Sequence, residues 1–220
     1  MKTYNSIPHH NKGIFNSEVI GFYKHDGSNL RFEWGHKRGW FKFGSRNVMI
    51  DRTNEHFGKG IDIFLNKYGD DLEHIFRTKY RKVENFVIFG EFVGQNSFAG
   101  QHVETDNKDI ILFDVDQYRR GLISPFEFFE NFGHLHIPDV VYRGKYTEEL
   151  IENVKLNKLP YGNLEEGIVV KGMSKTKNGK EEPWQVKIKT NKWLQLIKQK
   201  FGEKYLLEEL NGDTELFNKI

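Results

Sequence analysis

The sequence contains no cysteine among its 220 residues. This absence excludes disulfide bonds, thiolate metal ligands and cysteine nucleophiles, and it fits a reducing compartment. The sequence also lacks an apolar run long enough to cross a membrane, and its first residues lack the apolar core of a signal peptide. We therefore expect a cytoplasmic protein that does not associate with membranes.

Neither sign of charge is in excess, because 33 Lys and Arg face 31 Asp and Glu, for a formal charge of +2. Any affinity for nucleic acid must then come from local clusters of basic residues rather than from net charge. Hydrophobic residues make up 37% of the chain and charged residues 29%, which is typical of a folded globular protein. With 19 Phe, the core is expected to consist largely of phenylalanine.

Short apolar or alternating runs predict a fold rich in β-strands. Helical spacing begins near Gly60 and continues to about Lys82, and Gly69-Asp70-Asp71 predicts a break into two short helices. Thr190 is a candidate N-cap for a final helix. We expect one α+β domain over residues 1–220, with mainly antiparallel sheets flanked by helices. The predicted strands are 19–23, 30–34, 40–43, 85–94, 110–115, 165–171 and 184–189.

Several predicted strands carry a charged residue beside an apolar stretch. Taken singly, each has an ordinary structural explanation, such as a solvated strand end or a lysine that protects a sheet edge. Taken together they need partners, because burying a charge without one is costly. We expect these residues to meet one another, a metal or a phosphate in a common groove. They are Lys24, Glu91, Glu166, Lys171, Lys187 and Lys189.

Six ordered elements resemble the motifs of the covalent nucleotidyltransferases, the superfamily of ATP-dependent DNA ligases, RNA ligases and mRNA capping enzymes. The first, Lys24-His25-Asp26-Gly27, resembles the Lys-x-Asp-Gly signature, which is weak alone but specific when the later elements follow in order. The resemblance implies an ATP-grasp-like nucleotidyltransferase (adenylation) domain. The later elements are Arg46 (motif Ia), Phe89-Gly90-Glu91 (III), Leu112-Phe113-Asp114 (IIIa), Glu166 to Lys171 (IV) and Lys187-Ile188-Lys189 (V).

The resemblance implies that Lys24 attacks the α-phosphate of ATP and carries AMP as a phosphoramidate. A lysine must be neutral to attack, and neighbouring cations favour the neutral form. Glu166 would bind a divalent metal, Mg²⁺ or Mn²⁺, which prefers oxygen ligands. The phosphates would be neutralised by Lys171, Lys187 and Lys189.

The resemblance also implies the contacts of the nucleoside. Glu91 would hydrogen-bond the ribose, and Phe113 would stack on the base. Arg46 would engage the nucleotide or the acceptor strand. Tyr23 and Asn29, which flank the signature, complete the expected nucleotide-binding residues.

Asn29 indicates the branch of the superfamily, because many DNA ligases carry arginine at this position. The pattern Lys-x-(Asp/His)-Gly-(Ser/Thr)-Asn resembles phage-type RNA ligases of the second class, as does Tyr4-Asn5-Ser6-Ile7. The resemblance implies that a phage-like enzyme, acting in its host's cytoplasm, seals nicks between a 3′-hydroxyl and a 5′-phosphate in duplex RNA, DNA or hybrids. The alternatives are a minimal DNA ligase, a GTP-dependent capping guanylyltransferase and an inactive nucleic-acid-binding relative.

Residues 190–220 leave room for roughly one helix and a tail, so we expect a monomer without an OB or other C-terminal domain. Recognition of the nucleic-acid strands would then depend on basic runs or on a partner. His9 and His10 are expected to be exposed in a polar, irregular segment. The basic runs are Lys37-Arg38, Arg77-Lys79-Arg81-Lys82, Arg119-Arg120 and Lys175-Lys177-Lys180.

Overall fold

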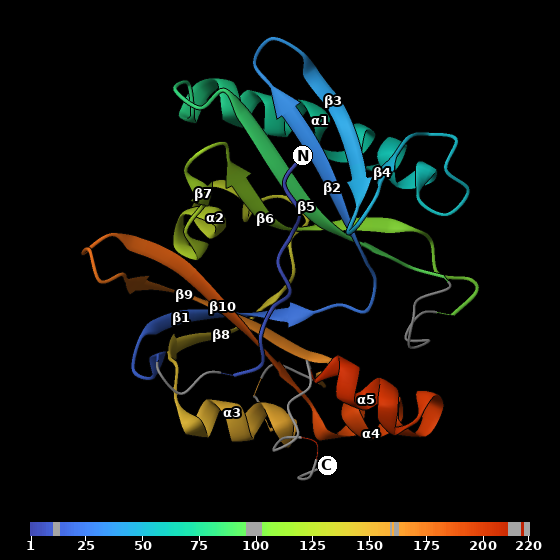
Figure 1. The fold of residues 1–220 in the computed structure, drawn as a ribbon, viewed down its shortest axis with the longest axis vertical. Coiled ribbons are helices and arrows are strands. Elements are labelled where there is room, and N and C mark those ends of the chain that lie inside the picture. The colour runs from blue at the N-terminus through green and yellow to red at the C-terminus, as the bar shows by residue number, and fades with distance from the viewer. Residues whose placement is uncertain (11–13, 96–102, 159, 161–162, 211–216, 218–220) are drawn as a thin grey trace. The chain divides into compact units, whose positions relative to one another are not determined.

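The structure, a computed structural model, describes residues 1–10, 14–95, 103–158, 160, 163–210 and 217 (Figure 1). The chain divides into two compact units. Unit 1 consists of Met1–Asn5 and His25–Pro138, and unit 2 consists of Ser6–Lys24 and Asp139–Ile220. This division does not test the expectation of a single nucleotidyltransferase domain, which stays a prediction.

Unit 1 is built on a six-stranded antiparallel sheet with the strand order β4-β3-β2-β5-β6-β7. Its strands are β2 (Ser28–Gly35), β3 (Gly39–Ser45), β4 (Met49–Ile50), β5 (Asn85–Val93), β6 (Asp109–Gln117) and β7 (Gly121–Leu122). Its helices are α1 (Gly58–Lys79) and α2 (Pro125–Phe132).

Helix α1 covers one face of this sheet because alternate residues of β2 point toward it. The ring of Phe32 stacks on Phe64 of α1 with a centroid separation of 3.6 Å. Phe76 of α1 stacks on Phe86 of β5 at 4.0 Å. All four rings are completely buried, so the expectation of a phenylalanine-rich core is confirmed.

The predicted break in α1 is wrong, because a single helix runs from Gly58 to Lys79. Tyr68 and Leu72 stay in phase across the expected break and are both buried, so packing outweighs the low helix propensity of Gly69. The carbonyl of Gly69 also accepts a hydrogen bond from Trp40 Nε1 at 3.2 Å.

Unit 2 is built on a four-stranded antiparallel sheet with the strand order β10-β9-β1-β8. Its strands are β1 (Glu18–Lys24), β8 (Val140–Lys145), β9 (Gly167–Lys175) and β10 (Glu181–Lys189). Its helices are α3 (Glu148–Lys155), α4 (Asn191–Phe201) and α5 (Glu203–Glu209). The expected α+β class with antiparallel sheets is confirmed.

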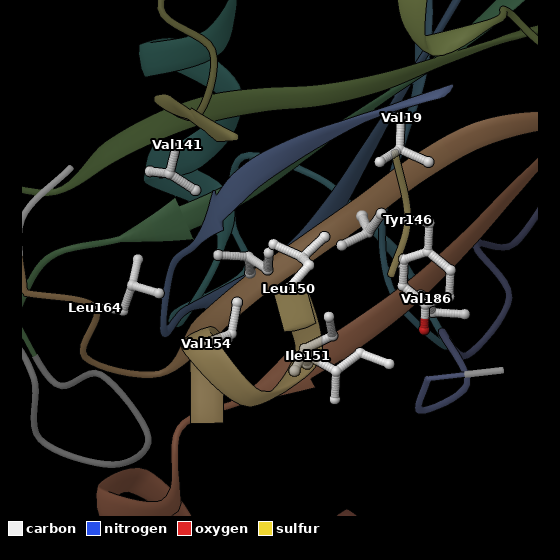
Figure 2. Packing of buried hydrophobic residues seen from close by; sticks show 11 residues of the cluster. Val19, Val141, Tyr146, Leu150, Ile151, Val154, Leu164 and Val186 are labelled. Carbon is white, nitrogen blue, oxygen red and sulfur yellow. The ribbon is translucent and has the colours of Figure 1, made fainter. Parts of the chain in front are cut away.

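The core of unit 2 lies between its sheet and α3. Figure 2 shows Leu150 and Val154 of α3 within a cluster that includes Val19 of β1 and Val186 of β10. The predicted cap at Thr190 is confirmed, because its hydroxyl accepts a hydrogen bond from the Trp193 amide at the start of α4. Among the described residues, no helix is both long and apolar enough to span a bilayer.

The packing of α1 predicts opposite effects for alanine at two of its glycines. At Gly69, a Cβ atom would meet Trp40 at 3.6 Å, an ordinary contact. We expect Gly69→Ala to raise the free energy of unfolding by about 0.5–1 kcal/mol, because glycine is a poor helix former. At Gly60, a Cβ atom would lie 2.7 Å from Leu30 Cδ1. Gly60→Ala should therefore lower the free energy of unfolding, because the buried Leu30 side chain would have to move. Urea denaturation measures both, and a destabilised Gly69→Ala variant would contradict the prediction.

Candidate active site

Three neighbouring strands of unit 2 bring Lys24 and Lys189 to opposite sides of one glycine. Lys24, the last residue of β1, pairs with Gly167 of β9, and Lys189 of β10 pairs with Gly167 from the other side. Glu166 immediately precedes Gly167, and its Oε1 lies 2.9 Å from Lys24 Nζ and 2.7 Å from Lys189 Nζ. Antiparallel register therefore gathers three residues that are far apart in the sequence at one end of the sheet.

Gly167 permits this arrangement because it has no side chain. Its φ of +147° lies in a region that other residues avoid. A Cβ atom there would overlap the carbonyl oxygen of Ile188 and lie 2.8 Å from Lys189 Cα. Any larger residue would have to push β10 away from β9 at the point where Lys189 reaches Glu166.

The carboxylate of Glu166 is buried between two ammonium groups. Its side chain is 4% exposed and that of Lys189 is 3% exposed. Burial by itself would raise the pKa of Glu166, but Lys24 and Lys189 outweigh burial and lower the pKa overall. The site thus holds a buried, ionised carboxylate with two lysines in direct contact.

A second carboxylate, that of Glu209 at the end of α5, contacts Lys189 and also Lys187. Its side chain pairs with Lys189, and Lys187 Nζ donates to the Glu209 carbonyl at 3.1 Å. Burial would raise the pKa of Glu209, but Lys189 and Lys187 lower it to about 2. Burial, reinforced by Lys189 and Lys24, lowers the pKa of Lys187 to about 8. No motif or spacing in the sequence indicates Glu209, which has the pattern of a surface glutamate on an amphipathic helix.

His9 also belongs to this group, so its expected exposure is wrong. The residue is 9% exposed, and its Nε2 donates to the Glu209 carbonyl at 3.1 Å. The chain is held there because the Lys187 amide donates to the carbonyl of Pro8 at 2.8 Å. Burial, reinforced by Lys187, lowers the pKa of His9 to about 4, and the imidazole is therefore neutral near pH 7.

Two further candidate residues of unit 2 lie on β9 and β1. Lys171 is buried at 5% exposure, with its Nζ 5.4 Å from the centroid of the Phe22 ring. Tyr23 precedes Lys24 and packs against the core of unit 2. Burial raises the pKa of its hydroxyl, and the nearby carboxylate of Glu165 adds to this effect.

The remaining candidates lie in unit 1, where cross-strand pairing brings two of them together. Asn29 of β2 pairs directly with Glu91 of β5, so their side chains share the sheet face opposite α1. The Asn29 Oδ1 atom is buried and makes no hydrogen bond within the described part of the chain. Arg46 follows β3 and is exposed.

Phe113 occupies a β-bulge of the same sheet. Phe89 pairs with Asp114 and Gly90 with Leu112, so Phe113 is the extra residue of β6. Its ring lies 5.0 Å from Tyr4 and 6.3 Å from Phe89. The bulge thus directs Phe113 to the face that carries Glu91.

The sequence also matches a known protein family. The sequence profile of the RNA ligases matches residues 17–190. The chain belongs to the RNA ligase family. This match confirms the resemblance inferred from the six motifs. Among curated protein sequences, none matches the chain.

Solved structures of the Naegleria gruberi RNA ligase share the fold. The ligase with PPi superposes with a TM-score of 0.62 at 14% identity. The match covers 91% of this chain and 59% of the ligase chain. An apo mutant of that ligase gives 0.62 at 13% identity, with 90% and 58% covered. A mutant with ATP and Mn gives 0.54 at 13% identity, with 88% and 57% covered. The chain therefore spans less than two thirds of the ligase that it matches.

The close approach at Gly167 predicts a severe effect of a single methyl group. We expect Gly167→Ala to lower the free energy of unfolding by about 3 kcal/mol or more, because positive φ and overlap with β10 add together. Gly179→Ala is the matched control, since Gly179 also has a positive φ, +77°, but a Cβ there would meet nothing within 4 Å. That variant should lose about 1 kcal/mol. Equal losses in urea denaturation would contradict the prediction.

Burial of neutral His9 predicts a loss of stability in acid. The folded-state pKa of about 4 lies below the ordinary 6.5, so the stabilisation is complete above pH 6.5 and declines as pH falls toward 4. Between about pH 7 and pH 4, the parent should lose about 3 kcal/mol more unfolding free energy than His9→Gln. His74→Gln, at an exposed position of α1, should behave like the parent. An unchanged pH dependence in His9→Gln would contradict the prediction.

Proposed function

We propose that the protein is an ATP-dependent polynucleotide ligase that acts through a covalent lysyl-AMP intermediate. The observation that carries this proposal is the contact of Lys24 and Lys189 with the buried carboxylate of Glu166. The family membership supports ligase chemistry, and the contact supports Lys24 as the nucleophile, because its amine lies in the same ion-pair group as the cation of Lys189.

In the first step, the amine of Lys24 attacks the α-phosphate of ATP. The new N–P bond forms as the bond to pyrophosphate breaks, and the amine loses a proton. Lys187 and Lys189 belong to the same charged group as Lys24 and would balance negative charge on the phosphates. Lys171 is buried on the same sheet and would add to this positive field.

The carboxylates of the site fit a divalent metal of the Mg²⁺ type. Such ions bind through one or two carboxylates together with substrate phosphates rather than through a complete protein cage. This matches the described residues, which contain no group of three or more His, Asp or Glu side chains able to hold a metal. Glu166 would hold the ion, Mg²⁺ or Mn²⁺, which supplies positive charge against the phosphates when bound.

Glu209 neutralises the two lysines that would contact the phosphates. Lys187 and Lys189 both pair with its carboxylate. When ATP binds, its phosphate oxygens would take the place of the Glu209 carboxylate beside these two ammonium groups. This exchange avoids leaving buried ammonium groups without a partner at any stage.

The candidate residues of unit 1 would bind the nucleoside. Glu91 would accept a hydrogen bond from the ribose, and Phe113 would stack on the base from its bulge. Asn29 would use its buried, unsatisfied Oδ1, because a buried acceptor without a donor is costly unless a ligand supplies one. Arg46 would contact the nucleotide or the acceptor strand, and Tyr23 would hold the Lys24 backbone through core packing.

Sealing would follow in two further steps. AMP would pass from Lys24 to a 5′-phosphate, and a 3′-hydroxyl would then displace it to form the phosphodiester bond. We propose nicked duplexes as substrates, with RNA on at least one side, because Asn29 follows the pattern of the RNA-ligase branch.

Labelling with nucleotide tests the proposal directly. We expect α-labelled ATP with Mg²⁺ or Mn²⁺ to leave label on the denatured protein, because the lysyl-AMP bond is covalent. Lys24→Ala should carry no label, and Lys189→Ala should lose about 10²-fold or more of the labelling rate. Lys145→Ala is the matched control, since this exposed lysine lies on the same sheet at the end of β8, and it should label like the parent.

Two outcomes would contradict the proposal. Label from GTP but not from ATP would favour the capping alternative. An absence of label from either nucleotide, with metal present and folding verified by circular dichroism, would favour the inactive relative. Nicked duplexes that carry RNA or DNA on each side would then establish which nicks the labelled protein seals.

A further inference from the structure

Three basic loops that are distant in sequence meet at one end of the unit 1 sheet. The first is the β2–β3 turn, and the second is the loop between α1 and β5. The His36 amide of the first donates to the carbonyl of Glu84 in the second at 3.2 Å. The third is the β6–β7 turn, whose Tyr118 amide donates to the carbonyl of Asn85 at 3.0 Å. Asn85 in turn pairs with Gly35, so backbone hydrogen bonds join all three loops.

Eight exposed cations project from these loops and from the last turn of α1, and we call them the basic end. Opposing them are Glu73, which pairs with Arg77, Glu84, and Glu127 and Glu130 of α2 near Tyr80. The cations outnumber these acids two to one, in a chain whose net charge is only +2. The members of the basic end are Lys37, Arg38, Arg77, Lys79, Arg81, Lys82, Arg119 and Arg120.

Aromatic rings hold several of these cations while leaving them accessible. The guanidinium of Arg38 lies 4.9 Å from the centroid of Phe41, and that of Arg77 lies 5.2 Å from Trp34. Arg119 covers Tyr118, whose side chain is 47% exposed, at 5.0 Å. Arg119 also has a φ of +64°, a backbone conformation that is costly for residues other than glycine. Such prearranged guanidinium groups suit phosphate oxygens.

We infer that the basic end binds the phosphate backbone of a duplex arm of the nucleic-acid substrate. This inference rests on the proposed ligase function and adds a second contact surface to it. A regular polyanion suits the surface better than an anionic bilayer does, because its eight exposed cations far outnumber the exposed aromatic residues near them, Tyr118 and Phe126 of the neighbouring helix α2.

The sheet fixes how far this surface lies from the nucleotide-binding candidates of unit 1. Asn29 and Gly35 stand near opposite ends of β2, a separation of about 20 Å at ~3.3 Å per residue. A B-form DNA duplex advances ~3.4 Å per base pair, so an arm of about six base pairs covers this length, and an A-form RNA arm of similar length serves the same purpose. Shorter arms would end before they reach the basic end.

Binding to intact duplex RNA, measured by fluorescence anisotropy over a range of salt, tests the inference without requiring catalysis. The variants are the double substitutions Lys37→Ala/Arg38→Ala, Arg81→Ala/Lys82→Ala and Arg119→Ala/Arg120→Ala. Each should weaken binding about 3- to 10-fold at moderate salt and reduce the slope of log affinity against log salt by about 1 to 2. Lys175→Ala/Lys177→Ala removes the same charge from the β9–β10 hairpin of unit 2 and should have little effect.

A set of nicked duplexes gives the second readout, with arms of about four to twelve base pairs on each side of the nick. The loss of affinity in the basic-end variants should disappear with arms shorter than about six base pairs. Self-adenylation without nucleic acid should be unchanged in every double variant, and this assay separates a failure here from a failure of the proposed function. Equal losses in the control variant, losses independent of arm length, or tighter binding to single strands or anionic vesicles would each overturn the inference.

Discussion

The close approach of three strands at Gly167 is the constraint on which the candidate active site depends. Lys24 and Lys189 face one another across this residue because both pair with it. Glu166 is the residue before it, so its carboxylate reaches both ammonium groups without any long loop. A glycine at this register position thus converts a regular antiparallel sheet into a charged site, and the site inherits the rigidity of the ladder.

The sequence could predict the strands that carry the candidate site residues, but not the partners of those residues. Alternation in β10 placed Lys187 and Lys189 on one face, and the structure shows both in contact with Glu209. Glu209 itself could not be predicted, because its role depends on how α5 packs and not on any local pattern. The same is true of His9, which is buried through a contact about 200 residues away in the sequence.

The helix α1 and the bulge at Phe113 show the same limit at the level of the fold. A local rule predicted a break at Gly69, yet the buried stripe of α1 continues through it, because tertiary packing outweighs propensity. The apolar run of β6 predicted a strand, but the extra residue that turns Phe113 toward the face of Glu91 is visible only in the register. Strand existence is a local property, whereas register is set by the partner strands.

The charge balance of unit 2 links its stability to its proposed chemistry. Lys24, Lys187 and Lys189 face the buried carboxylate of Glu166 and the partly exposed carboxylate of Glu209, and His9 stays neutral beside them. Without those carboxylates, three ammonium groups would repel one another in a partly desolvated site, and the fold would be strongly destabilised. A site that binds phosphates, as we propose for this one, would therefore carry its own anions when empty. Glu166 is held by the strand that follows it, because Gly167 is paired on both sides, whereas Glu209 is the last residue of the short helix α5. We therefore expect Glu209 to be the more easily displaced anion, and exchange there would leave the Lys24–Glu166 pair intact.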